Sequence, residues 1–207
     1  MTARLPDAYF DRMYAASADP WQLQERWYER RKFAITMALL PQSRYRHAYE
    51  PGCSVGVLTE QLAGRCDRVT AADVAPAALD AAARRLAGAG YSDTVTLLRR
   101  SIDDDWPATD FDLIVLSEVG YYLEHDALRA TLDRELPRLR RPATVVAAHW
   151  RHPVADYPMS GDDVNDAVAA TRGLHRIGGY RDDDVAIDVF DTESSASVAA
   201  RTRVPGA

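Results

Sequence analysis

The stretch that decides the fold is residues 49–63, "YEPGCSVGVLTEQLA". An apolar approach leads into two glycines four positions apart, Gly52 and Gly56, and then into a segment with the pattern of an amphipathic helix. A strand that turns through glycines into a helix leaves backbone N–H groups beside a ligand, and nucleotide-type cofactors are the usual occupants. The dinucleotide fingerprint has three glycines spaced G-x-G-x-x-G, however, and Glu50 stands where the first of them would be. The identity of the cofactor therefore depends on Glu50.

The carboxylate of Glu50 predicts a ligand that is partly cationic. At the end of the first strand it would repel a pyrophosphate, but it would attract an ammonium or a sulfonium. A second apolar run, "RVTAAD", ends at Asp73, twenty-one positions beyond Gly52. An acidic side chain at about that place accepts hydrogen bonds from ribose hydroxyls. Adenosine with a cationic amino-acid arm in place of a diphosphate is S-adenosyl-L-methionine, so these residues predict that cofactor.

The wider pattern predicts an α/β fold: a Rossmann-like, doubly wound, mostly parallel seven-stranded sheet with a C-terminal antiparallel hairpin. The run "FDLIVLS" is apolar almost throughout, which favours a central strand covered on both faces. Before it, "SIDDDWPATD" leaves room only for a turn in the crossover. The expected strands are 46–50, 68–73, 94–99, 111–117 and 143–149, and the expected helices between them are 56–64, 76–88 and 126–136.

Both ends of the chain depart from this alternation. Residues 20–40 carry apolar and aromatic side chains at helical spacing after Asp19-Pro20, which predicts one helix ahead of the first strand. In residues 173–192, two strand-like runs joined by "RDDD" predict the hairpin. We expect a single domain over residues 1–192 and a flexible tail over residues 193–207, because the tail has little to bury.

Composition narrows the range of partners and compartments. A net charge of −6 argues against nucleic acid and against anionic membranes as partners. Neither an apolar leader nor a run of about eighteen apolar residues occurs, so we expect neither secretion nor membrane insertion. Cys53 and Cys66 form no CxxC pair, which indicates a reduced, cytoplasmic protein without disulfides. Lys32 is the only lysine, which we interpret as compositional bias without a binding role.

Several motifs together resemble a known family. The pattern E-x-G-x-x-x-G from Glu50 to Gly56, the acidic Asp73 and "FDLIVLSEVGYYL" resemble class I S-adenosylmethionine-dependent methyltransferases. Within them, "DPWQLQERWYERRKFA", "YEPGCSVGVLTEQLA", "DLIVLSEVGYYL" and "AHWRHPVADYPMSGDDV" are similar to the nodulation protein S group, over roughly residues 20–190. A rhizobial member of that group N-methylates a deacetylated amino-sugar end of a chitooligosaccharide. The resemblance implies methyl transfer to a small-molecule acceptor.

The resemblance also assigns residues to the cofactor. Glu50, Gly52 and Gly56 would form the methionine-side turn, and Asp73 would hold the ribose. Ser101 stands at the adenine edge, where the family often has an aspartate. A helical lid over about residues 8–40 would contribute Trp21, Tyr28 and Arg31. The full cofactor-binding set is Glu50, Gly52, Cys53, Gly56, Asp73, Val74, Ser101, Ile102, Ser117, Trp21, Tyr28 and Arg31.

The acceptor side is predicted from the residues that follow the fourth and fifth strands. Glu118 and His149 are the candidate catalytic residues, and the candidate substrate residues are Tyr122, Arg151 and His152. The alternative is that Glu118 caps the next segment and His149 packs below it. His149 and His152 lack a third metal ligand, so we expect no metal.

Three other functions stay open at this point. The acceptor atom could be an oxygen of a small natural product instead of a nitrogen. The chain could be an NAD-dependent oxidoreductase, although Glu50 argues against it, or a cofactor-binding module without catalysis.

Overall fold

The computed structural model describes residues 4–108, 110–193 and 196–206. The strands are β1 (Tyr45–Pro51), β2 (Cys66–Asp73), β3 (Val95–Arg99), β4 (Leu113–Ser117), β5 (Thr144–Trp150), β6 (His175–Arg181) and β7 (Val185–Asp191). The α-helices are α1 (Asp7–Ala16), α2 (Trp27–Leu39), α3 (Val57–Ala63), α4 (Pro76–Gly88), α5 (His125–Glu135), α6 (Gly161–Ala169) and α7 (Val198–Arg201). Two 3-10 turns, η1 (Gly120–Tyr122) and η2 (Leu136–Arg138), precede and follow α5.

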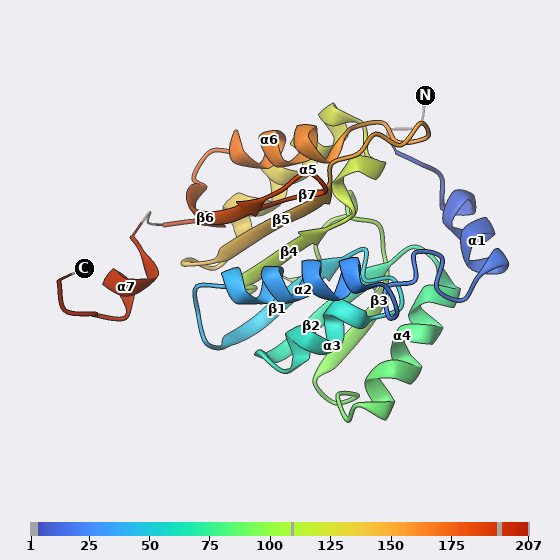
Figure 1. The fold of residues 1–207 in the computed structure, drawn as a ribbon, viewed down its shortest axis with the longest axis horizontal. Coiled ribbons are helices and arrows are strands. Elements are labelled where there is room, and N and C mark those ends of the chain that lie inside the picture. The colour runs from blue at the N-terminus through green and yellow to red at the C-terminus, as the bar shows by residue number, and fades with distance from the viewer. Residues whose placement is uncertain (1–3, 109, 194–195, 207) are drawn as a thin grey trace.

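The described residues form one seven-stranded sheet in the order β3-β2-β1-β4-β5-β7-β6 (Figure 1). β1 pairs in parallel with β2 on one side and with β4 on the other, so the carboxyl ends of β1 and β4 are neighbours. Ligands of open α/β sheets bind in the crevice at such a switch point. β7 runs antiparallel to both β5 and β6, which confirms the predicted fold class and its hairpin.

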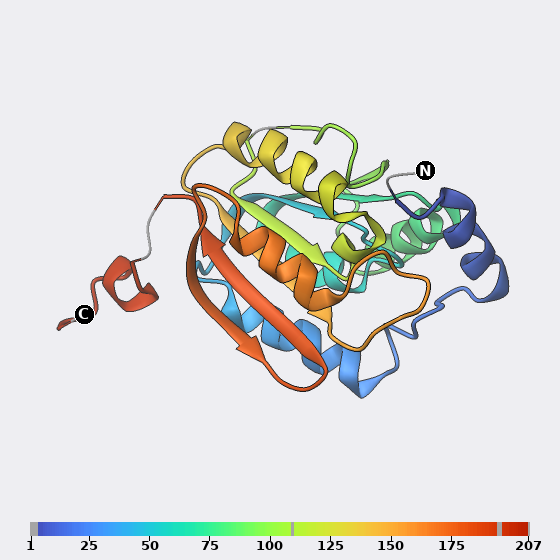
Figure 2. The ribbon, with the colours of Figure 1, turned by 90° about the horizontal axis from the view of Figure 1, so that it is seen from above.

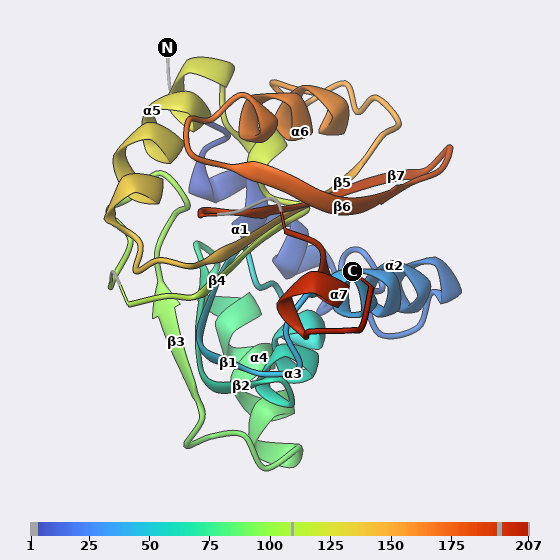
Figure 3. The same cartoon turned by 90° about the vertical axis from the view of Figure 1, so that its left-hand side faces the viewer.

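The parallel strands and the helices between them agree with the sequence pattern to within two residues at each end. β4 is the middle strand and is buried along its whole length, because helices cover both faces of the sheet (Figure 3). α2, α3 and α4 lie on one face, where Phe33 and Leu62 belong to the core. α5 and α6 pack side by side on the other face (Figure 2), and Leu132 and Val168 are fully buried there.

The single helix predicted for residues 20–40 is wrong at its start. Residues 20–25 form turns, and the helix α2 begins only at Trp27. The backbone of Gln22 is left-handed (φ 56°), and its N–H bonds to the Asp19 carbonyl at 3.1 Å, which a continuous helix would not allow. A separate helix, α1, precedes the turns and packs against α4. The chain leading into α1 is held in place by a hydrogen bond from Leu5 N–H to the Tyr122 carbonyl at 2.9 Å.

The sequence pattern also missed α6, between β5 and the hairpin. Ser160 accepts a hydrogen bond from Asp163 N–H at 3.2 Å, and the Asp163 carboxylate accepts from Ser160 N–H at 3.0 Å. This reciprocal capping box is readable in the sequence as a serine followed three residues later by an acid.

The flexibility expected for the C-terminal tail stays a prediction, and so does the single-domain boundary at residue 192. Residues 194, 195 and 207 lie outside the described part of the chain. The described part of the tail contains the short helix α7, and Arg201 forms an ion pair with Asp191 at 2.6 Å. In the ranges that the structure describes, none of the helices combines the length and the apolar character needed to cross a membrane.

Candidate active site

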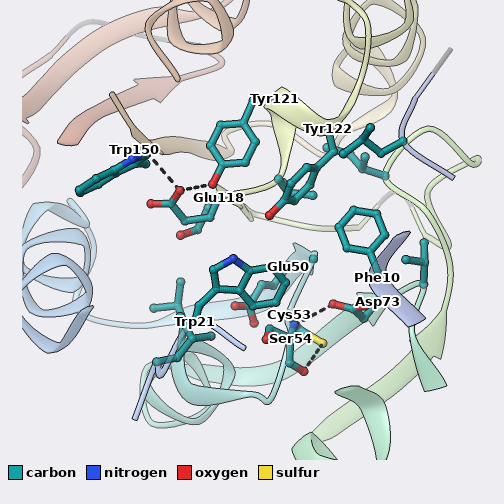
Figure 4. Close-up of a pocket in the computed structure, with 18 of the residues that line it drawn as sticks. Phe10, Trp21, Glu50, Cys53, Ser54, Asp73, Glu118, Tyr121, Tyr122 and Trp150 are labelled. Atoms are coloured by element: carbon teal, nitrogen blue, oxygen red, sulfur yellow. Dashed lines mark hydrogen bonds between the residues drawn. The ribbon is translucent and has the colours of Figure 1, made fainter. Parts of the chain in front are cut away.

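A cavity of about 330 Å³ opens at the carboxyl ends of β1, β2 and β4 (Figure 4). This volume is within the range of small-molecule sites. Most of the side chains predicted from the sequence line it: Trp21, Tyr28, Glu50, Gly52, Cys53, Asp73, Val74, Ser101, Ile102, Ser117, Glu118 and Tyr122. The lining also includes residues to which the sequence analysis assigned no role in the site, among them Phe10, Tyr14, Glu29, Lys32 and Trp150.

The glycine turn forms the floor of one half of the cavity. Gly52 has φ +76°, and a Cβ atom there would lie 2.7 Å from Val119 Cγ2, so only glycine fits. The N–H groups of Gly52 and Cys53 both bond to the Ala72 carbonyl, which ties the turn to the end of β2. Gly56, with φ +79°, is the N-cap residue before α3 and lies close to Ala82, but it does not itself line the cavity.

Glu50 is buried at the base of this half, with 3% of its surface exposed. Its Oε2 accepts a hydrogen bond from the Thr59 hydroxyl at 2.6 Å. Burial raises the pKa of Glu50 to about 8, although the Thr59 hydrogen bond opposes the shift. A carboxyl group in this state becomes an anion readily when a cation is placed beside it.

Asp73 ends β2 and faces the same half of the cavity. Its two carboxylate oxygens accept hydrogen bonds from Ser54 N–H and Ala75 N–H, each at 2.9 Å. Burial raises the pKa of Asp73, while these backbone bonds oppose the shift. Each oxygen keeps a further lone pair, so the carboxylate can still accept from a ligand hydroxyl. Asp73 therefore both fixes the turn and remains available to a ribose.

The helix α1 contributes two aromatic side chains that close this half. The Tyr14 hydroxyl lies 2.5 Å from Ser54 Oγ, and Phe10 packs edge to face on Tyr122 with ring centroids 4.9 Å apart. The four-residue spacing of the two rings, which places them on one face of a helix, was the sequence signal that could have identified them.

At the edge of the cavity predicted for the adenine, the Ser101 hydroxyl donates to Asp103 and the Ser101 N–H donates to Asp104 at 3.0 Å. The hydroxyl and the N–H of Ser101 are thus already hydrogen-bonded to two neighbouring aspartates.

Glu118 stands at the other half, directly after β4 (Figure 4). Its backbone is left-handed (φ 56°), a strained conformation of the kind found at functional sites. Oε1 accepts from Lys32 Nζ at 2.8 Å, and Oε2 accepts from the Tyr121 hydroxyl and from Trp150 N–H at 3.2 Å. Burial alone would raise the pKa of Glu118, but the charge of Lys32, the neighbouring His149 and these hydrogen bonds together hold it below its usual value. The group is an anion at neutral pH.

His149 is fully buried and does not line the cavity. Its Nε2 accepts the Gly120 N–H at 3.3 Å, and its Nδ1 donates to Asn165 Oδ1 at 2.8 Å. Burial lowers the pKa of His149, so the ring is neutral and holds η1 in place. This placement corresponds to the packing alternative. Among the described residues, no three His, Cys, Asp or Glu side chains are grouped to hold a metal ion.

Three residues assigned by resemblance or by position lie away from the cavity. The Arg31 guanidinium contacts Tyr180 and the Asp182 carboxylate, at 2.9 Å for the latter, because its position on α2 faces the hairpin. Arg151 pairs with Asp162 at 3.0 Å. The exposed ring of His152 bonds to Asp184 at 2.8 Å. None of the three lines the cavity in the described structure, since each side chain is held by an aspartate outside it.

The sheet order and the glycine turn define the class of protein, because this is the Rossmann-like fold of class I S-adenosylmethionine-dependent methyltransferases. Residues 9–155 match the family described as Nodulation protein S (NodS). The match covers well over half of the chain, and the chain belongs to that family.

Relatives and solved structures agree with this assignment. Nodulation protein S of Rhizobium tropici is 39% identical over 110 residues, which cover 52% of this chain and 44% of that protein. The chain spans about half the length of the curated relatives that it matches, between 44% and 58%.

Two crystal structures are similar to this chain over most of its length. That of N-methyltransferase NodS from Bradyrhizobium japonicum WM9 in complex with S-adenosyl-L-homocysteine has a TM-score of 0.78 and 26% identity, and the match covers 89% of this chain and 96% of that one. A putative methyltransferase from Pseudomonas syringae has a TM-score of 0.65 and 35% identity over 80% of this chain and 99% of that one.

Proposed function

We propose that this protein transfers a methyl group from S-adenosyl-L-methionine to the nitrogen of a small amine, with deacetylated amino sugars as the first acceptors to test. The observation that carries the proposal is one cavity that has a glutamate in each of its two halves. Glu50 lies at the glycine turn, and Glu118 lies across from it after β4 (Figure 4). The related NodS structure, which contains the product S-adenosyl-L-homocysteine, supports the choice of cofactor.

The residues present fit that cofactor. Glu50 would face its ammonium, the glycine turn would pass under its amino-acid arm, and Asp73 would accept from its ribose hydroxyls. When bound, the cofactor supplies a methyl group on a positively charged sulfur. The aromatic side chains Phe10, Tyr14 and Trp21 would cover the site and exclude water from it.

The ionised state of Glu118 favours a nitrogen atom as the methyl acceptor. A neutral amine attacks with its lone pair, and the positive charge passes from sulfur to the new methylammonium, so no proton must leave during transfer. An anion beside the nitrogen stabilises that developing charge. An acceptor hydroxyl would instead need a base, and Glu118 is a weak one because its pKa lies below the usual value. O-methylation therefore fits this geometry less well and is one outcome of the acceptor assay.

Replacing Glu118 tests this assignment. We expect Glu118→Gln to lower kcat/KM for glucosamine or another accepted amine by roughly tenfold or more, because the neutral amide cannot stabilise the ammonium. The affinity for S-adenosylhomocysteine should change little. Glu60→Gln is the matched control, since Glu60 pairs with Arg85 outside the cavity. Wild-type turnover by Glu118→Gln would refute the role of Glu118 and direct the search to Tyr121, Asp156 and Tyr157.

Cofactor binding should depend on pH through Glu50. Below pH 8 the free protein holds a proton on Glu50, whose pKa is about 8, and the ligand ammonium must expel it. Affinity for S-adenosylhomocysteine should therefore rise with pH, by at most about tenfold per unit, and level off above about 8. Titration calorimetry between about pH 6 and 9 measures this. Glu50→Gln should flatten the profile, whereas a flat wild-type profile would contradict the ionisation of Glu50 on binding.

A further inference from the structure

Lys32 occupies an unusual place for the only lysine of the chain. The sequence has 25 basic residues, and all the others are arginines. Lys32 is buried on α2, with 2% of its side chain exposed, between two carboxylates. Its Nζ lies 2.7 Å from Glu29 Oε2 and 2.8 Å from Glu118 Oε1. The prediction that this lysine reflects compositional bias alone does not account for this position.

The geometry suits lysine and does not suit arginine. A compact ammonium offers three donors from one point, whereas a guanidinium offers a wide planar fork. Lys32 Nζ also lies 5.4 Å from the centre of the Tyr28 ring and 5.1 Å from that of Phe33, which leaves little room around it. Replacing a buried ion pair by packed apolar side chains is often neutral or stabilising, so fold stability is a poor reason for this cluster.

We propose that Lys32 is a positioning residue for the acceptor amine: it keeps Glu118 ionised and oriented toward the cavity without itself contacting the amine. This rests on the proposed function. Tyr121 and Trp150 hold Oε2 of Glu118 (Figure 4). Lys32 holds Oε1, so the carboxylate is fixed at both oxygens. With Glu29, Lys32 and Glu118 all ionised, the cluster keeps one net negative charge, which suits an ammonium.

The other titratable groups around Glu118 cannot replace Lys32. His149 is neutral at pH 7, because burial lowers its pKa. Burial raises the pKa of Glu29, which when ionised has the same sign of charge as Glu118. The surrounding tyrosines are neutral as well, because burial raises the pKa of each of them: Tyr28, Tyr121, Tyr122 and Tyr157. Without the ammonium, burial would dominate and Glu118 would retain a proton at higher pH.

A charge-matched double variant tests this in turnover. Lys32→Met with Glu29→Gln removes one charge of each sign, so the cluster keeps its net charge while Glu118 loses its cation. At saturating cofactor, with glucosamine or the best amine of a panel as the varied substrate, kcat/KM falls below the pKa of the amine and falls more steeply where Glu118 also takes up a proton. We expect this second, steeper break of the acidic limb to move up by about one pH unit or more. S-adenosylhomocysteine affinity should change less than about threefold, because Lys32 faces the other half of the cavity. A uniform loss with an unmoved second break would mean that Lys32 is only structural.

A double-mutant cycle separates an indirect role from direct contact. In a Glu118→Gln background, adding Lys32→Met should lower kcat/KM by no more than about twofold further, because the group on which Lys32 acts is already neutral. Losses that simply add would show that Lys32 acts on the acceptor or elsewhere, and would overturn the proposal.

The single lysine permits a measurement that needs no acceptor. In protein labelled with 13C-lysine, one side-chain NMR signal reports Lys32. The two carboxylates raise the pKa of Lys32 against the opposing effect of burial, so its signal should begin to titrate at lower pH in Glu118→Gln. An unchanged titration would overturn the pairing. If the pairing holds but no amine is methylated by wild-type protein that binds S-adenosylhomocysteine, the proposed function fails instead.

Discussion

Glu50→Lys is expected to abolish binding of S-adenosylhomocysteine, a loss of several kcal/mol or at least about a thousandfold in affinity. Glu50 is buried and lines the cavity, so a lysine there would place a cation against the ligand ammonium. The variant would also lose the hydrogen bond from Thr59. The same change should not create NAD binding, since position 50 still lacks the glycine of the dinucleotide fingerprint.

Two variants make this result interpretable by calorimetry. Glu60→Lys, with the same charge reversal on α3, should bind as the wild type does, because Glu60 does not line the cavity. Glu50→Gln keeps the size of the side chain and should bind more weakly than the wild type but more tightly than Glu50→Lys. Retained binding by folded Glu50→Lys would show that Glu50 does not face a cationic group of the ligand.

The second large effect is expected at Asp73. Asp73→Ala should weaken S-adenosylhomocysteine binding by about 1.5 to 3 kcal/mol, the range for hydrogen bonds to a charged group. Part of this loss comes through the turn, because the carboxylate also accepts from Ser54 N–H and Ala75 N–H. Asp73→Asn keeps one acceptor oxygen and should lie between the alanine variant and the wild type.

The controls for Asp73 follow from the same strand. Asp67 is on β2 as well, but it is exposed and pairs with Arg44, so Asp67→Ala should leave binding unchanged. Thermal unfolding of each variant separates loosening of the turn from loss of the ribose contact. Affinity that survives in Asp73→Ala would remove Asp73 from the cofactor site.

The sequence predicted the part of the site that depends on local geometry. Gly52 adopts a positive φ against Val119, and Asp73 ends its strand, so their places in the cavity follow from residue type and strand order. The placement of β4 in the middle of the sheet follows likewise from its apolar run. Each of these features needs only a short stretch of chain and the pairing rules of parallel sheets.

The features that sequence patterns missed depend on distant segments. Lys32 meets Glu118 only because α2 packs beside the end of β4, and no spacing in the sequence shows this. Arg151 and His152 follow β5 in sequence, but an ion pair of Arg151 with Asp162 and a hydrogen bond between His152 and Asp184 hold both side chains away from the cavity. The break before α2 was hidden because the apolar side chains of residues 20–40, taken together, are mostly at helical spacing, yet residues 20–25 form turns.

The most direct test of the central claim follows the methyl group itself. Purified protein is incubated with S-adenosyl-L-methionine labelled in its methyl group and with glucosamine, short deacetylated chitooligosaccharides and a panel of amines and hydroxyl compounds, and the products are identified by mass spectrometry. The account predicts that the label appears on the nitrogen of an amine, with formation of S-adenosylhomocysteine, and that Glu118→Gln reduces the rate. Label found on oxygen alone, or folded protein that binds NAD and not S-adenosylhomocysteine, would contradict it.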